Sequence, residues 1–357
     1  MVGSNAGIYN YNGSNNIIMG SNAGIGTLNV TNIQNGDNNN NIFIGSNAAS
    51  SISNGYQNIC IGNNAAALIN SDSKNIAIGN SALFSHDNSN ATENITIGNF
   101  AGYFLKNGST NILIGQEAGL KVNQHNLIFI GKEAGRVNTT GANNLFIGTE
   151  AGKANTTSSN NIYLGPNSGK VNNGSNNTIV GSSALEEATG GNNCCVFGAN
   201  AGKKNTGNDN IYIGKSSAEN ATTGTNNIIM GVDSLLNGNT NNSIIIGKEA
   251  GKQTVGSKNI FLGNETGKAN TSGYNNIYSG YQSGKSSTTG TDNIYLGSNS
   301  GSSATTSSLN VVIGSDAAPN FTTTSNIIAI GYNSGFNCSC FSKISISFFS
   351  VSLSLSL

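Results

Sequence analysis

The stretch NNLFIGTEAGKANTTSSNNIYLG, residues 143–165, contains one full copy of a unit that recurs along the chain. The general form is Asn-Ile-x-Ile-Gly, then x-x-Ala-Gly, then a polar turn. A marker glycine ends each apolar segment, and successive marker glycines are 16 or 17 residues apart, except for spacings of 25 after Gly20 and 19 after Gly79. The marker glycines are Gly3, Gly20, Gly45, Gly62, Gly79, Gly98, Gly115, Gly131, Gly148, Gly165, Gly181, Gly198, Gly214, Gly231, Gly247, Gly263, Gly280, Gly297, Gly314 and Gly331.

This repeat length predicts the fold class. Helical-hairpin repeats need about 33 residues or more, whereas a unit of this size fits one coil with two short strands and two turns. We therefore expect an all-β fold, a parallel β-solenoid of about twenty coils over residues 1–335, with longer loops at 27–40 and 84–93. The tail, 336–357, breaks the period and alternates Ser with apolar residues, which is typical of either a capping strand or a segment without function.

Composition excludes several classes of protein. Only 9% of the residues are charged, against about 25% in average globular chains. The formal net charge is zero, so no electrostatic attraction to nucleic acid or to an anionic membrane is expected. The sequence shows no classical secretory signal and no apolar run of about eighteen residues, so we expect no membrane insertion.

Each predicted strand is apolar on both faces. We expect the residues on either side of its centre, such as Ile42 and Ile44, to form aliphatic columns inside the coil. The central residue would then point outward, and a strand that is apolar on both faces must be buried on both. We therefore predict that the outward column is an interface between copies of the chain. Its candidate residues are Phe43, Phe129, Phe146, Tyr163, Tyr212, Phe261, Tyr278 and Tyr295.

Two further columns are expected along the axis of the solenoid. The Asn before each strand should stack into an amide ladder along the axis. The small residues after the marker glycine, such as Ala151-Gly152, predict a second strand that lets the walls of a narrow roll approach closely. The ladder residues include Asn75, Asn94, Asn111, Asn161, Asn210 and Asn259.

Charged residues also recur at fixed repeat positions and predict an acidic and a basic column on the rim. Two interpretations remain open: solvated charges that prevent lateral aggregation, or a basic ladder that binds anionic glycans. The acidic positions are Glu117, Glu133, Glu150, Glu249 and Glu265. The basic positions are Arg136, Lys153, Lys170, Lys203, Lys252, Lys268 and Lys285.

Residues that could carry chemistry are scarce. The two histidines, His86 and His125, lie in a loop and a turn with no acidic or Cys partner nearby in the pattern. The five cysteines show no zinc-type spacing, and we expect no enzyme activity, no cofactor and no metal. Thr pairs such as Thr139-Thr140 fall in turns and build no flat Thr-x-Thr face, which disfavours ice binding.

The unit Asn-Ile-x-Ile-Gly-x-x-Ala-Gly resembles the head repeat of YadA-like trimeric autotransporter adhesins, whose hallmark is an Asn-Ser-x-Ala-Ile-Gly segment. Units with Thr-Thr-Gly-x-Asn-Asn, at 139–144 and 222–227, are more similar to repeats of phage and large-virus tail-fibre-like proteins. The resemblance covers residues 1 to about 335, although the coils are longer than in the adhesins and neither a coiled-coil stalk nor a membrane anchor is seen.

The resemblance implies a left-handed β-roll, three chains about a common axis and a role in attachment. We therefore expect a homotrimeric, adhesive or structural fibre on a cell or virion surface. Its partners would be copies of itself and a host glycan or protein receptor. An ice-binding or purely structural solenoid is the alternative, and a glycan-active β-helix enzyme is less favoured.

Overall fold

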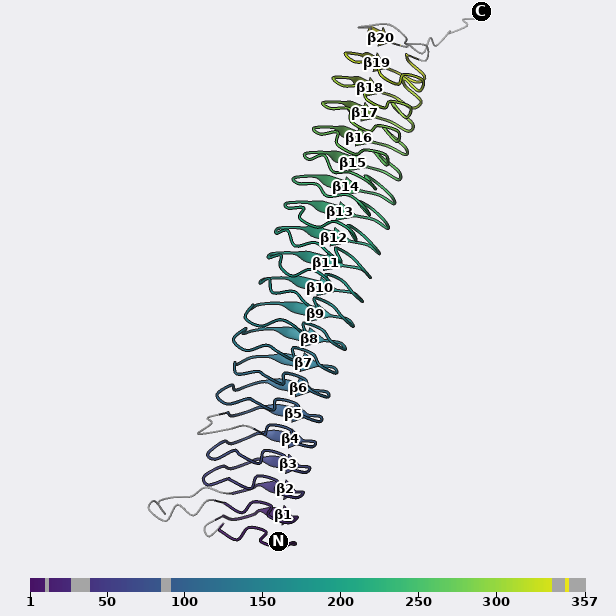
Figure 1. Ribbon diagram of the computed structural model, residues 1–357. Coiled ribbons are helices and arrows are strands. Elements are labelled where there is room, and N and C mark those ends of the chain that lie inside the picture. Colours follow the sequence, from purple (N-terminus) through teal and green to yellow (C-terminus); the bar gives the residue numbers. More distant parts are fainter. Residues whose placement is uncertain (10–12, 27–38, 85–90, 336–343, 347–357) are drawn as a thin grey trace, which may run out of the picture. The chain divides into compact units, whose positions relative to one another are not determined.

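The computed structural model describes residues 1–9, 13–26, 39–84 and 91–335, and the backbone of 344–346 (Figure 1). Every regular element in these ranges is a β-strand of three residues, with no helix among them. The chain divides into two compact units, Met1–Asn193 and Cys194–Leu357, each of which is described by itself. Most of the two predicted long loops, and most of the predicted tail, lie outside the described residues.

The strands follow one another at the repeat spacing. Those of the first unit are β1 (Ile17–Met19), β2 (Ile42–Ile44), β3 (Ile59–Ile61), β4 (Ile76–Ile78), β5 (Ile95–Ile97), β6 (Ile112–Ile114), β7 (Ile128–Ile130), β8 (Leu145–Ile147), β9 (Ile162–Leu164) and β10 (Thr178–Val180). Those of the second unit are β11 (Cys195–Phe197), β12 (Ile211–Ile213), β13 (Ile228–Met230), β14 (Ile244–Ile246), β15 (Ile260–Leu262), β16 (Ile277–Ser279), β17 (Ile294–Leu296), β18 (Val311–Ile313), β19 (Ile328–Ile330) and β20 (Ile344–Ile346).

Within each unit, strands of successive coils pair in parallel and in register. Phe146 of β8 pairs with Phe129 of β7 and with Tyr163 of β9, so equivalent repeat positions lie side by side. Hydrogen bonds between coils continue beyond the strands, as where Gly148 N–H donates to the Ile130 carbonyl at 2.8 Å. The predicted all-β, parallel β-solenoid is confirmed. β20 pairs with β19 and so continues the pairing beyond residue 335.

The two faces of each strand are the reverse of those predicted. The central residue points into the solenoid and its neighbours point outward: Phe146 is 0% exposed, whereas Ile147 is 38% exposed. All eight residues predicted to form the interface between copies are fully buried within a single chain, so they cannot contact another copy and that prediction is wrong. They are Phe43, Phe129, Phe146, Tyr163, Tyr212, Phe261, Tyr278 and Tyr295.

The amide ladder explains this orientation. Residues two apart in a strand share a face, so Asn144 and Phe146 point the same way. Asn144 is buried and donates from Nδ2 to the Ser158 carbonyl across the coil at 2.8 Å, while its Oδ1 accepts from the Asn161 N–H at 3.0 Å. A buried amide left without such partners would cost about 1–3 kcal/mol. The face that carries the Asn must therefore be the one that meets the polar turn inside the coil.

The amide ladder itself is confirmed, in several segments. Side chain to side chain bonds link Asn75, Asn94 and Asn111, and likewise Asn210 and Asn227. Asn259 accepts from the backbone N–H of Asn276 at 3.0 Å, as Asn161 does from Asn177 at 2.9 Å. Other residues interrupt the ladder, at Leu127, Cys194, Ser243 and Ile327.

Aromatic rings fill the interior as parallel stacks. In the first unit the Phe146 ring lies between those of Phe129 and Tyr163, with centroids 4.8 and 4.6 Å apart. In the second unit Tyr278 lies in the same way between Phe261 and Tyr295, at 4.9 and 4.7 Å. These offset contacts add to the free energy of burial, because ring pairs at this separation attract one another.

The predicted second strand is absent from the described residues. Ala151 and Gly152 lie in a turn in which Glu150 and Gly152 both have φ 57°. Gly152 is small for another reason: a Cβ on it would lie 2.5 Å from Cε2 of Phe146. The small residue at this corner of the coil, Gly152, therefore leaves space for the Phe146 ring and does not serve to bring two strands close together.

The corner residue, six positions after the central strand residue, is a leucine in three of the described coils, and none of these three has an aromatic central residue. These leucines have a similar left-handed φ of 46° to 49°. These pairs of corner and central residues are Leu83 with Ala77, Leu185 with Ile179, and Leu235 with Ile229. Glycine accompanies most of the aromatic residues.

This complementarity predicts a strong coupling between Phe129 and Gly135. A Cβ on Gly135 would lie 2.3 Å from the Phe129 ring, so Gly135→Leu alone should destabilise the fold, and Phe129→Ala alone should cost about 3–5 kcal/mol through the cavity it leaves. The double variant recreates the natural Ala77 and Leu83 pair. We expect it to be more stable than the sum of the single effects by at least about 1 kcal/mol, measured by urea unfolding followed by circular dichroism. Additive effects would contradict the packing described here.

Candidate assembly surface

The outer face of the strands is the candidate functional surface. In the first unit it carries twenty outward positions, two for each of the ten described strands, and nearly all are aliphatic. They are Ile17, Met19, Ile42, Ile44, Ile59, Ile61, Ile76, Ile78, Ile95, Ile97, Ile112, Ile114, Ile128, Ile130, Leu145, Ile147, Ile162, Leu164, Thr178 and Val180. We call this set the outer face, together with its continuation at the first and third residues of β11 to β19 in the second unit.

The outer face remains exposed although its columns are continuous. Neighbouring coils cover part of each side chain, because Ile128 lies beside Leu145 and Leu145 beside Ile162. Even so, Ile162 is 39% exposed, and Ile211 and Ile246 of the second unit are 37% and 36% exposed. Soluble monomers seldom expose a contiguous apolar patch above about 600 Å². A surface with this many outward aliphatic side chains is typical of an interface.

Further apolar side chains follow the marker glycine at the end of several strands. Val232, Tyr281 and Tyr332 occupy this position and are 42%, 53% and 65% exposed. They lie in the second unit, directly after β13, β16 and β19. The apolar character of the outer face therefore extends past the strands at these coils.

The charged residues form two columns, as predicted, and the columns neutralise each other. In the first unit Lys153 contacts Glu133 and Glu150, and Lys170 contacts Glu150 at 2.6 Å. In the second unit Lys268 contacts Glu249 and Glu265. Further pairs are Arg136 with Glu117 and Glu133, Lys252 with Glu249, and Lys285 with Glu265. The six basic residues named in these pairs thus have carboxylate partners, and they do not present a row of unpaired cations.

The paired geometry shifts the pKa of the carboxylates. Glu265 lies 2.9 Å from Nζ of both Lys268 and Lys285, and Nε2 of Gln282 donates to it at 2.7 Å. Hydrogen bonds from Lys268, then Lys285 and Gln282, lower the pKa of Glu265 from 4.5 to about 2. Those from Lys170 and Lys153 likewise hold the pKa of Glu150 below its usual value.

These shifts predict a loss of stability in acid. A carboxylate whose pKa is lower in the folded state stabilises the fold above its unfolded pKa, 4.5, and this contribution is lost as the pH falls toward 2. Glu265→Gln should therefore lower the thermal midpoint at pH 6 but have little effect at pH 2. Glu219→Gln is the control, because Glu219 forms no ion pair with any described residue. An equal effect of Glu265→Gln at both pH values, measured by circular dichroism, would contradict the ion-pair account.

The described residues bring together no group of three His, Cys, Asp or Glu side chains that could hold a metal. Cys60 and Cys194 are buried, and burial raises the pKa of both thiols. His125 has a structural contact that the sequence did not reveal: its Nδ1 accepts from the Ser109 N–H at 3.0 Å. His86 and the tail cysteines, Cys338 and Cys340, lie outside the described residues.

The predicted Thr pairs lie in turns, as expected. In several pairs the first hydroxyl donates to a backbone carbonyl of the next coil, as from Thr139 to Thr156 and from Thr288 to Thr305, each at 3.0 Å. No helix in the described ranges is long and apolar enough to cross a membrane. Compared with known proteins, the chain matches no protein-family model and no curated relative.

Proposed function

We propose that this protein is a structural fibre that associates laterally with copies of itself through the outer face. The observation that carries the proposal is the largely aliphatic surface that each unit presents on strands whose opposite side is already packed. The interior of each coil is filled by its own buried side chains, and the described chain has no further sheet or helix that could cover the outer face. A second copy offers a surface of the same periodicity and chemistry.

The size of the surface supports association. Stable protein interfaces use about 20–30 residues on each side, and the twenty outward positions of the first unit alone reach this number. Each Å² of apolar surface removed from water contributes about 25 cal/mol. Flat sheets pack face to face at about 10 Å, which suits two columns of branched aliphatic side chains per face.

The number of copies and the biological role rest on the resemblance to YadA-like head repeats and tail-fibre-like proteins. That resemblance supports three copies around a common axis and attachment to a host or surface ligand, at a cell or virion surface. Residues in the turns would then meet the ligand, because association covers the outer face. A solenoid with a purely structural role, and ice binding, remain the alternatives to attachment.

Substitutions on the outer face test the proposal. Ile211→Lys, Ile246→Lys and Leu262→Lys together place three ammonium groups on a surface that would become dry. A solvated monomer tolerates them because their alkyl stems can lie along the sheet. We expect the wild type to have a mass of three times 36.4 kDa by light scattering after gel filtration, and the triple variant to have 36.4 kDa with an unchanged β-sheet spectrum.

The matched control carries Ile8→Lys, Phe104→Lys and Val255→Lys, so it adds the same number of ammonium groups. These apolar side chains are 46%, 43% and 55% exposed, and they lie outside the strands instead of on the outer face. The control should keep the mass of the wild type. A wild type that is monomeric at every concentration would overturn the proposed association.

A further inference from the structure

A second side-chain ladder runs along the turn that precedes each strand. The residue two positions before the ladder Asn accepts a hydrogen bond from the backbone N–H of the equivalent residue in the preceding coil. In the second unit Thr225 N–H donates to Asn241 Oδ1 at 2.9 Å, and Asn241 N–H donates to Ser257 Oγ at 3.2 Å. Thr291 and Ser308 continue the pattern, with Thr291 N–H donating to Ser308 Oγ at 3.0 Å.

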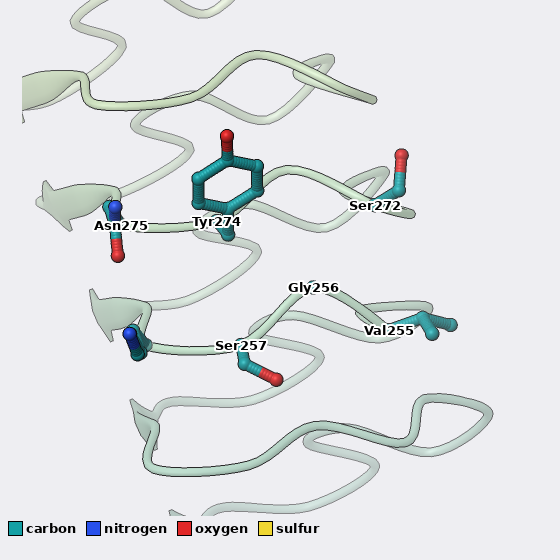
Figure 2. A pocket seen from close by; sticks show the side chains of 7 residues that line it. Val255, Gly256, Ser257, Ser272, Tyr274 and Asn275 are labelled. Carbon is teal, nitrogen blue, oxygen red and sulfur yellow. The ribbon is translucent and has the colours of Figure 1, made fainter.

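Tyr274 interrupts this turn ladder. It occupies the position at which its neighbours carry Ser, Thr or Asn, and its side chain accepts no hydrogen bond from the Ser257 N–H. In Figure 2 the Tyr274 side chain extends away from the coil that carries Ser257. The Ser257 N–H therefore has no acceptor among the described residues.

A groove of about 480 Å³ lies at this interruption. Val255 and Ser257 line it from one coil and Ser272, Tyr274 and Asn275 from the next (Figure 2). Val255 and Tyr274 are 55% and 49% exposed, so the groove offers apolar surface beside hydroxyl, amide and peptide groups. This combination is typical of small-molecule sites, in which a few polar groups orient a ligand on an apolar lining.

The same groove contains an unpaired cation. Lys258 lines it and forms no ion pair with any carboxylate of the described chain, unlike the basic residues of the rim column. One carboxylate, that of Asp292, is hydrogen-bonded to a lining residue: it accepts from Nδ2 of Asn275 at 3.1 Å and not from Lys258. A groove lined by both a lysine and a free backbone N–H favours a carboxylate ligand, because hydrogen bonds to an ionised group are stronger than those between neutral groups.

We propose that the groove binds an acidic sugar residue, with the sugar carboxylate between Lys258 and the Ser257 N–H. The sugar's apolar surface would lie on Val255 and Tyr274, and its hydroxyls would reach Ser272 and Asn275. This proposal rests on the proposed attachment role and identifies the chemistry of the ligand. It places anionic-glycan binding in the groove instead of on the neutralised basic column.

The probe is the methyl glycoside of D-glucuronic acid, titrated into the full chain and followed by calorimetry. Lys258→Gln removes the charge. Tyr274→Ser restores a hydroxyl to the turn ladder, and this hydroxyl would accept the hydrogen bond from the Ser257 N–H. Each substitution should weaken binding at least about tenfold, the loss expected for one charge-assisted hydrogen bond. Tyr274→Ser should also preserve the fold, because Ser is the residue that neighbouring coils use.

Lys248→Gln and Tyr56→Ser are the matched controls, since they make the same changes outside the groove and should leave binding unchanged. Methyl glucoside, which lacks the carboxylate, should bind at least about tenfold more weakly. Absence of saturable binding, or equal binding by the Lys258→Gln variant, would overturn the proposal. Light scattering on the same samples reports association separately, so failure of the sugar site leaves the mass of the assembly as an independent result.

Discussion

Parallel hydrogen bonding between successive coils is the constraint on which the other features depend. The N–H groups of one coil donate to carbonyls one residue before the matching position of the next, as from Ile128 to Asn144 at 3.0 Å and from Ile162 to Asn177 at 2.8 Å. Because the backbone dihedrals repeat with the sequence, each side chain lies beside its equivalent at the strand spacing of about 4.8 Å. Side chains at the same repeat position within a unit thus form a column. Each such side chain must pack against a similar side chain at that distance without a clash or an uncompensated charge.

The columns meet this requirement in different ways. Amides donate to one another, and aromatic rings stack with nearly parallel planes, 4° apart for Phe129 and Phe146. Like charges repel, so the basic column is stable only because an acidic column lies beside it and places Lys153 between Glu133 and Glu150. The column of marker glycines leaves no room for any side chain, because a Cβ on Gly148 would lie 2.4 Å from the carbonyl oxygen of Gly165.

Much of this arrangement could be predicted from the period of the sequence. The spacing of the marker glycines and the alternation within Asn-Ile-x-Ile-Gly predict coils, strands and columns, and the amide ladder follows from them. Which face points inward could not be decided from hydrophobicity, because Phe146 and Ile147 are both apolar. Two features of the sequence do indicate the inward face: Asn144 shares the face of Phe146, and Gly152 offers space for a ring.

The turns were less predictable, because their conformation depends on left-handed dihedrals at non-glycine residues. Glu150, at φ 57°, is one of these, and no periodic pattern of apolar residues identifies it. For this reason the prediction of a second strand at Ala151-Gly152 was wrong. The interruption at Tyr274 was also invisible in the sequence, since its meaning depends on hydrogen bonds that Ser257 and Ser308 accept in neighbouring coils.

The uniformity of the outer face has a consequence for the association proposed above. Two surfaces made only of Ile columns could slide past each other by one coil with little change in buried area, so their register would be weakly specified. The few polar residues on the outer face can specify the register. Thr178 opposite an Ile of another copy would leave a buried hydroxyl without a partner, at a cost of about 1–3 kcal/mol, whereas two facing Thr178 hydroxyls can bond to each other. The polar Ser279 of the second unit acts in the same way. Under lateral association, copies that run parallel and in the same register are therefore the arrangement that these side chains favour.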